Sequence, residues 1–225
     1  MAAAHARGYA ALAITDDCSL SGVVRAHAEA QRLGLHLIVG AQMQLQAPVQ
    51  AQRGAVEPAS SSVLAGQAGP RLVLLAQNRR GYGNLSQWIS VARRRAPKGQ
   101  YLAQPSDLEG RVPNAPYLAG LPGCFAILLP EATQSFETLF AHAMWLKTWF
   151  GADRCAIAVE LLHRPHDALR LERLPQVAEL SGLSLVACGD VLMHARSRKP
   201  LQDLLTATRL NLPVADCGLA LEPNA

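Results

Sequence analysis

Residues 72–95 read LVLLAQNRRGYGNLSQWISVARRR, and this stretch decides the fold class. It opens with five consecutive aliphatic residues at 72–76, which is typical of a short strand buried on both faces. A helical pattern follows at 83–95. A buried strand that leads into a helix is the repeating unit of α/β folds, so the stretch predicts a sheet covered by helices.

The same alternation of strand and helix continues on both sides of this stretch. Further apolar runs lie at 10–15, 35–39, 125–129, 156–161 and 183–187. Helical patterns lie between most of them, at 19–33, 135–150 and 167–181, and a last one begins at Pro200 and runs through 209. Because only a crossover of a dozen residues or more can join parallel neighbours, this order predicts parallel strands. We expect an α/β barrel or a doubly wound sheet.

Two segments interrupt the alternation. Residues 46–70 are rich in Ala, Gln, Ser, Gly and Pro and contain one acid, Glu57, which predicts a flexible surface insertion. Residues 104–122 contain four prolines, which predicts a second loop.

The composition excludes several classes of protein. The chain has 225 residues, of which 50% are apolar and 17% charged, as in globular rather than disordered proteins. No stretch approaches roughly 18 uninterrupted apolar residues and the N-terminus lacks the features of a signal peptide, so we expect no membrane span and a cytoplasmic location. The five cysteines form no C-x-x-C pair and lie mostly in apolar runs, which predicts reduced thiols.

Positive charge is concentrated in one part of the chain. The net charge is only +4, but no acid occurs between Gln77 and Ser106. The basic residues of this part, called here the basic segment, are Arg79, Arg80, Arg93, Arg94, Arg95 and Lys98, with Tyr82, Trp88 and Tyr101 among them. Two interpretations have equal weight: a phosphate-binding face, or a solvated helix end favoured by the helix dipole.

Polar residues that follow three of the apolar runs are candidates for a site, because ligands of parallel α/β folds gather at the carboxyl ends of strands. The first run ends in Asp16 and Asp17, for which capping of the next helix is the first expectation and metal ligation the second. The fifth run ends in Glu160, with His163, His166 and Asp167 close behind. The sixth run is followed by Asp190 and His194.

An acid at the edge of a buried strand is costly unless it is paired, so we expect Glu160 to have a partner or a role. Other common sites lack their residues in this sequence. There is no Gly-rich phosphate loop between a strand and a helix, no G-x-S-x-G and no H-E-x-x-H. Nucleotide-binding, serine-hydrolase and zincin functions are therefore not indicated.

Five stretches together carry a resemblance to a known family. They are GYAALAITDDCSLSGVVRAHAEA at 8–30, LHLIVGAQM at 35–43, residues 72–99, VELLHRPHD at 159–167 and residues 189–225. This sequence resembles the N-terminal PHP (polymerase and histidinol phosphatase) domain of bacterial C-family DNA polymerases, and among them the error-prone, damage-induced branch. The resemblance covers nearly the whole chain apart from residues 46–70 and 104–122.

The resemblance implies a distorted seven-stranded α/β barrel that, in active members, holds two or three divalent metals for phosphoester hydrolysis. Active members carry an H-x-H on the first strand, and we expect that strand to be absent here. Asp16 and Asp190 match acids of the family pattern, whereas Gln42 replaces an acid and Leu192 replaces a histidine. Neither replacement suits a hard cation.

We therefore assign no catalytic residue, and we expect at most one loosely bound divalent cation (Mg, Mn or Zn). Its candidate ligands are Asp16, Asp190, Glu160 and His194, although the expectation for His194 is a surface histidine.

The expected function follows from the resemblance. Residues 1–225 are predicted to be a single PHP domain, truncated at its N-terminus and without a polymerase palm, fingers or thumb. We expect a degenerate structural and interaction module that braces the downstream polymerase domains of an enzyme for translesion DNA synthesis, DNA repair and replication. DNA contact through the basic segment is part of this hypothesis. The alternatives are a metal-dependent phosphoesterase or 3′-5′ proofreading nuclease, and an open barrel that pairs through an exposed strand edge.

Overall fold

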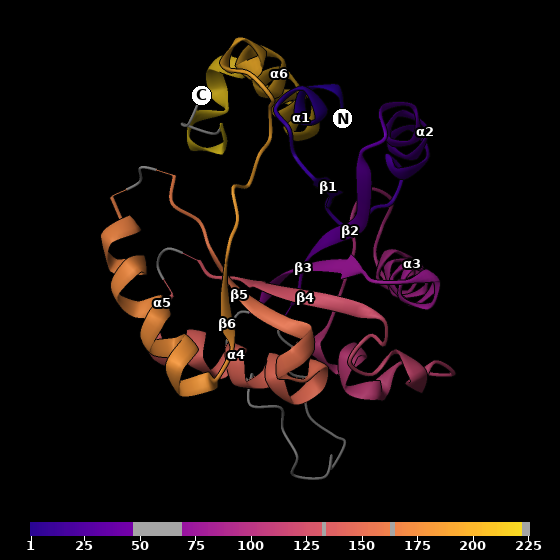
Figure 1. Cartoon of the computed structure of the whole chain (residues 1–225), viewed down its shortest axis with the longest axis vertical. Helices are drawn as coiled ribbons and strands as arrows, with labels where there is room; N and C mark the ends of the chain where they lie inside the picture. Colours follow the sequence, from indigo (N-terminus) through magenta and orange to yellow (C-terminus); the bar gives the residue numbers. More distant parts are fainter. Residues whose placement is uncertain (47–68, 132–133, 163–164, 222–225) are drawn as a thin grey trace. The chain divides into compact units, whose positions relative to one another are not determined.

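The apolar runs of the sequence become six strands of a single sheet (Figure 1). Their bounds are β1 (Ala11–Ile14), β2 (His36–Gln44), β3 (Arg71–Ala76), β4 (Cys124–Leu129), β5 (Cys155–Val159) and β6 (Ser184–Ala187). The structure is a computed structural model and describes residues 1–46, 69–131, 134–162 and 165–221. The predicted insertion at 46–70 falls almost wholly on 47–68, outside the described residues.

The chain divides into two units. The first comprises residues 1–159 and 168–187 and contains the whole sheet, and the second comprises residues 160–167 and 188–225. The strands of the first unit follow one another across the sheet in chain order, with β1 and β6 at its edges. The part of the chain described here therefore supplies six strands, one fewer than the barrel that the resemblance implies.

The prediction that all strands are parallel is wrong for β3. The pairs β1–β2, β4–β5 and β5–β6 are parallel, but β3 runs antiparallel to both β2 and β4. The reason lies in the connection from β3 to β4. The chain leaves β3, forms a helix and returns to the same end of the strand, where the Gln77 N–H donates to the Gly123 carbonyl oxygen at 2.9 Å. A chain that returns to the end it left must enter the next strand in the opposite direction.

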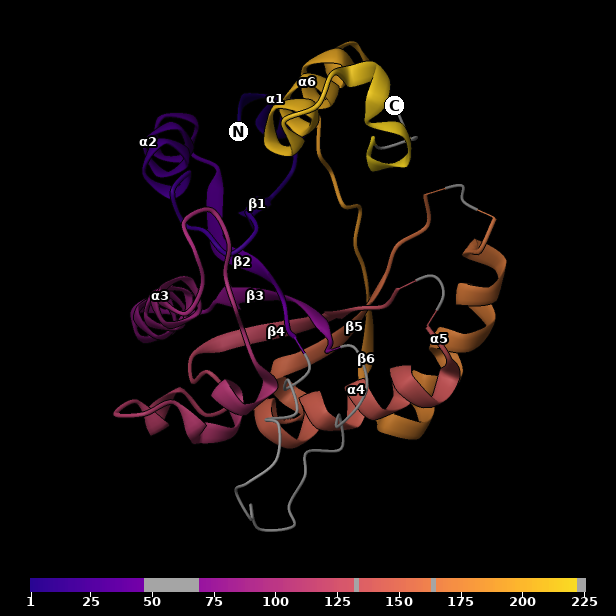
Figure 2. The same ribbon diagram turned by 180° about the vertical axis from the view of Figure 1, so that it is seen from behind.

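The helices of the first unit are α1 (Ala2–Ala6), α2 (Val23–Leu33), α3 (Arg79–Arg94), α4 (Phe136–Phe150) and α5 (Asp167–Ser181), whose first residue belongs to the second unit. Helices α2, α3 and α4 pack against the sheet, and α1 packs against α2. In Figures 1 and 2, α3 lies beside the end of β3 and α4 lies beside β4 and β5, in agreement with their contacts. The core between them buries large side chains completely, among them Trp88, Phe150, Met43 and Leu74.

The segment at 104–122 is not the simple loop that its prolines predict. It contains a π-helical turn, η1 (Asp107–Arg111), and a 3-10 turn, η2 (Pro116–Leu118). Leu108, Leu118 and Leu121 of this segment are fully buried in the core. The prolines break regular structure, but the leucines between them supply enough apolar surface to pack the segment down.

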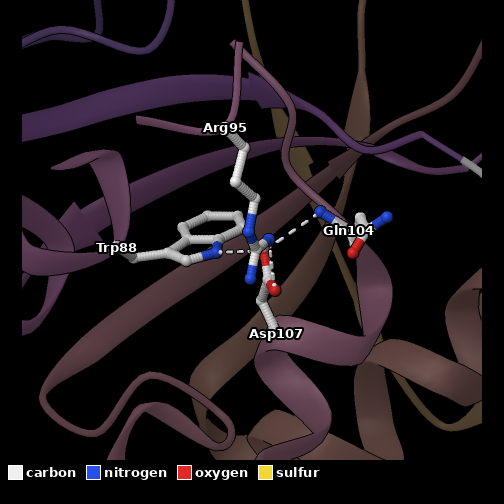
Figure 3. A network of polar contacts seen from close by, with 4 residues as sticks. All are labelled: Trp88, Arg95, Gln104 and Asp107. Carbon is white, nitrogen blue, oxygen red and sulfur yellow. Dashed lines mark hydrogen bonds and ion pairs between the residues drawn. The ribbon is translucent and has the colours of Figure 1, made fainter. Parts of the chain in front are cut away.

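Two buried acids fasten the same segment to two helices. Asp107 accepts a hydrogen bond from the Trp88 indole N–H of α3 at 3.1 Å, and Glu109 accepts one from the Trp145 indole N–H of α4 at 2.9 Å. Figure 3 shows Asp107 also facing Arg95, whose Nη1 lies 2.7 and 2.8 Å from its two carboxylate oxygens. Each indole donor that the core buries thus has an acceptor, as buried polar groups require.

The second unit, taken by itself, is largely helical. It contains α6 (Lys199–Leu210) and the short turns η4 (Arg196–Arg198), η5 (Val214–Asp216) and η6 (Gly218–Ala220). The predicted helix from Pro200 to 209 is confirmed by α6. Only Thr206 and Ala207 of this helix are buried, so it presents most of its side chains to solvent.

Candidate functional site

The first candidate residues lie where β1 ends. Asp17 bridges to Gln42 of β2 in the parallel direction. The Gln42 N–H donates to the Asp16 carbonyl oxygen at 3.1 Å, and the Cys18 N–H donates to the Gln42 carbonyl oxygen at 2.8 Å. The backbone of Gln42 therefore fixes the turn at residues 16–18, while the side chains of Asp16 and Asp17 are exposed.

Neither acid caps the following helix, which was the first expectation for them. Helix α2 begins at Val23 rather than at residue 19, and its N-cap is Gly22, with no side-chain capping hydrogen bond. The Asp17 carboxylate instead accepts a hydrogen bond from the Tyr101 hydroxyl at 2.8 Å. A Cβ placed on Gly22 would lie 3.1 Å from Asp16 Oδ2, so the Asp16 carboxylate lies directly beside the start of α2.

Arg93 of the basic segment holds this turn from α3. Its Nε and Nη2 donate to the Cys18 carbonyl oxygen at 3.1 and 3.0 Å, and Nη2 also donates to the Asp17 carbonyl oxygen at 3.2 Å. The guanidinium also lies 5.4 Å from the centre of the Tyr101 ring, in a cation–π arrangement. Arg93 is therefore part of the structure that supports the strand end.

The turn needs such support because Cys18 has a φ of 46°, in the left-handed region that non-glycine residues rarely adopt. Tyr101 adds a second clamp, since its hydroxyl accepts from the Gln44 N–H at 2.9 Å while it donates to Asp17. Burial raises the pKa of the Tyr101 hydroxyl, and the Asp17 carboxylate adds to the effect. The hydroxyl therefore stays protonated and remains a donor.

The six basic residues predicted to form one face belong to two sets. Arg93 and Arg95 turn inward, Arg93 to the carbonyl oxygens of residues 17 and 18 and Arg95 to the buried Asp107. Arg79, Arg80, Arg94 and Lys98 are exposed. The sequence could not separate the sets, because Asp107 lies 12 residues from Arg95 and the carbonyl oxygens of residues 17 and 18 lie 75 or 76 residues from Arg93.

The remaining candidate ligands lie in the second unit. Glu160 is 5% exposed and lies close enough to Cys188 to raise the pKa of that thiol, after the larger effect of burial. Asp190 is half-buried and has a φ of 41°. His194 and His166 are exposed, and His163 lies outside the described residues. The structure thus assigns Asp16 to the first unit, and Glu160, Asp190 and His194 to the second.

The donors present do not match the requirements of a metal cluster. The neutral amide of Gln42 is a weak ligand for a hard cation, and Leu192, which is 45% exposed, has no donor atom. Over residues 1–46, 69–131, 134–162 and 165–221, no group of three or more His, Cys, Asp or Glu side chains within either unit is placed to hold a metal ion. Within either unit, the described donor set does not fit a cluster of divalent ions.

A family model described as the PHP domain matches residues 1–159. The chain belongs to the PHP domain family. Its mixed α/β fold, a sheet of parallel and antiparallel strands with helices packed against it, agrees with the fold expected for that family.

Comparison with curated proteins gives relatives of this PHP chain along its whole length. It is 44% identical over 225 residues to the error-prone DNA polymerase of Ralstonia nicotianae, covering 100% of this chain and 19% of that protein. It is 48% identical over 217 residues to the error-prone DNA polymerase of Methylococcus capsulatus, covering 96% of this chain and 18% of that protein. The chain therefore spans about a fifth of the length of the curated relatives it matches.

Among solved structures, the PHP chain is similar to a candidate metal-dependent phosphoesterase from Bifidobacterium adolescentis. The two share 13% identity with a TM-score of 0.49, and the match covers 86% of this chain and 80% of that chain. Within the described residues, no helix has the length and apolar character needed to cross a membrane.

Proposed function

We propose that this chain is the PHP module of an error-prone DNA polymerase and acts as a structural and interaction module without hydrolytic activity of its own. In this proposal it braces downstream polymerase domains in the cytoplasm, in an enzyme that copies damaged DNA. Identities of 44% and 48% to two proteins named error-prone DNA polymerase support the proposal that the chain is a module of such an enzyme.

The observation that carries the non-catalytic part is the donor set. Hydrolysis of phosphoesters by metal clusters needs several negative or imidazole ligands around each pair of ions. The resemblance places Gln42 and Leu192 where the family pattern has an acid and a histidine, and within the described residues of either unit no cluster of three donors is formed. Asp16 and Asp190 keep their carboxylates, which favours the alternative of a phosphoesterase or proofreading nuclease.

Elemental analysis of the purified chain separates these functions. The proposal expects less than one equivalent of zinc, manganese or magnesium after dialysis, and no release of nucleotides from 3′-labelled single-stranded DNA when each metal is added. Two retained metal ions, together with nucleotide release that Asp16→Ala and Asp190→Ala both abolish, would establish the nuclease and overturn the proposal. Glu131→Ala, at an exposed acid outside the candidate ligands, is the control.

A contact with DNA through the basic segment is the second part of the proposal. The segment has no acid from Gln77 to Ser106, and although Arg95 is paired with Asp107, Arg79, Arg80, Arg94 and Lys98 are exposed and supply a positive field at the surface. Salt dependence is the test, because each phosphate neutralised releases counterions. If all six cations bound phosphate, log Kd against log salt would have a slope of about 5 in magnitude on duplex DNA. A slope near zero would remove the DNA contact from the proposed function.

A further inference from the structure

The basic segment contains an outward set of cations that the structure separates from the inward pair. Arg79 and Arg80 lie in the first turn of α3, Arg94 in its last turn, and Lys98 four residues beyond Arg94. All four side chains are exposed, and no hydrogen bond or ion pair to them is found among the described residues. These four residues are called here the outer cations.

Three of the four outer cations lie on α3 and share one face of it, and Lys98 lies just beyond the end of the helix. At 100° per residue, Arg79, Arg94 and Arg80 fall within about 100° of one another around the helix. Gly83, Gln87 and Ser90 occupy the same sector and are also exposed. The face therefore has cations at both ends and uncharged, mostly small side chains between them, with Tyr82 43% exposed at its border.

Helix stability does not explain the two arginines at the start of α3. The N-terminal end of a helix carries partial positive charge, so cations there are unfavourable and acids are preferred. The first turn of α3 has no acid, and its N-cap is the neutral side chain of Asn78, which accepts from the Gly81 N–H. The helix dipole favours Arg94 in the last turn, but it works against Arg79 and Arg80. Their presence indicates a role other than stabilising the helix.

The spacing fits a nucleic-acid backbone. From residue 79 to residue 94 the helix rises about 22 Å at 1.5 Å per residue. One strand of a duplex carries a phosphate roughly every 3.4 Å along the axis, so the face spans about six phosphates. Small side chains in the middle let a backbone approach α3 closely, and the exposed tyrosine ring is a surface on which a base can stack.

We propose that the outer face of α3 binds the sugar-phosphate backbone of DNA through the outer cations, and that Arg93 and Arg95 take no part in binding. This inference rests on the DNA contact in the proposed function and specifies its residues. The ligand is recognised by its regular row of phosphates, so binding is independent of base sequence.

The test is fluorescence anisotropy with the full chain and labelled 20-nucleotide DNA, single-stranded in one arm and duplex in the other, from 50 to 200 mM NaCl. With four phosphate contacts, the slope of log Kd against log salt for duplex DNA is about 3.6 in magnitude. Binding should therefore weaken roughly 100-fold between the lowest and the highest salt concentration. The variant R79Q/R80Q/R94Q/K98Q is expected to lose at least tenfold in affinity at 50 mM NaCl and most of the salt dependence. The arm that binds more tightly identifies the form of DNA.

A control variant of equal charge makes the result specific. R25Q/R32Q/R196Q/R209Q also removes four exposed arginines, but none from α3. It is expected to bind within threefold of the unchanged chain. Equal losses in both quadruple variants would show that only net charge matters and would overturn the assignment to α3. Competition by poly-glutamate as strong as that by unlabelled DNA would overturn the assignment to nucleic acid.

Failure of this inference can be told apart from failure of the proposed function. If the unchanged chain binds DNA and R79Q/R80Q/R94Q/K98Q binds equally well, the outer face of α3 is not the site, while the proposed DNA contact stands. If the unchanged chain does not bind either form of DNA at 50 mM NaCl, both are wrong. Thermal melting of both quadruple variants confirms that they are folded before binding is compared.

Discussion

At the level of single residues, Asp107 is a buried acid with three hydrogen-bond partners. Its carboxylate is about 1% exposed and accepts from Trp88, Arg95 and the Gln104 N–H. Removing one partner of a buried ion pair typically costs about 3–5 kcal/mol, and Arg95, which is 26% exposed, can recover part of this by turning to water. We expect Asp107→Ala to lower the free energy of unfolding by about 2–4 kcal/mol in urea titrations.

Arg94→Ala is the matched control for this experiment, since Arg94 adjoins Arg95 in the chain but is exposed. Exposed substitutions of this kind stay within about 0.5 kcal/mol. A loss below about 1 kcal/mol in Asp107→Ala would mean that the network of Figure 3 contributes little to stability.

The buried thiols give a second prediction for single residues. Burial raises the pKa of Cys18 and of Cys155 to about 11 and that of Cys124 to about 12, from an ordinary value of 9.0. Because folding raises these values, the folded chain holds the thiol protons more tightly than the unfolded chain does. Their contribution to stability is complete below about pH 9 and is lost as the pH rises toward 11.

Between pH 9 and pH 11, each of these thiols lowers the free energy of unfolding by about 1.4 kcal/mol per pH unit. Urea titrations at pH 8, 9, 10 and 11 measure it, and Cys155→Ala should make the decline shallower by about one thiol's share. An unchanged decline in that variant would assign the pH dependence to other groups.

At the level of elements, the sequence is a good guide to which segments are strands and helices and a poor guide to their direction. Every apolar run of the sequence forms a strand. The prediction that all of them are buried holds for β4 and β5 but is wrong for β1 and β6, which lie at the edges of the sheet and are covered less. The reversed direction of β3 depends on where the chain returns after α3, and no local pattern records this. The packing of residues 104–122 depends likewise on partners in α3 and α4.

The same limit applies to the candidate site. Sequence patterns identified Asp16 and the basic segment, because acids after strands and runs of arginine are local features. They did not identify the role of Tyr101 or of Arg93, because the hydrogen bonds of these residues to the turn at 16–18 join residues 75 or more apart. Such contacts are properties of the folded chain, and only the aromatic and basic composition of 93–101 hinted at them.

The join between α3 and β4 provides a prediction at this scale. A Cβ on Gly81 would lie 1.9 Å from the Gly123 carbonyl oxygen, so the backbone of α3 approaches the start of β4 as closely as a glycine allows. Gly81→Ala forces these elements apart, and we expect it to lower the free energy of unfolding by about 1–3 kcal/mol, measured as a lower midpoint in urea titrations.

Gly83, on the exposed face of the same helix, is the matched control. A Cβ there would have no atom within 4 Å, so Gly83→Ala should stabilise the chain by about 0.5–1 kcal/mol through helix propensity. Equal effects of the two substitutions would show that α3 can shift away from β4 at no cost.

At the level of the whole molecule, the two units differ in how much apolar surface they bury. The first unit encloses the core, with α4 alone burying Leu139, Ala143, Trp145, Leu146 and Phe150. In the second unit, α6 exposes Leu201, Leu204 and Leu205 at 48%, 55% and 57%. The relatives are about five times longer than this chain, so the proposed bracing role gives these leucines a candidate function in contacts with further domains.

This difference predicts unequal local stability within the chain. Helices with few buried apolar side chains open without unfolding the remainder, so their amides exchange quickly with solvent. We expect hydrogen–deuterium exchange with mass spectrometry to show α6 exchanging at least tenfold faster than α4 in the same sample. The comparison within one chain controls for pH and temperature. If α6 were as protected as α4, its leucines would be covered in solution, and they would then be unavailable as a docking surface for polymerase domains.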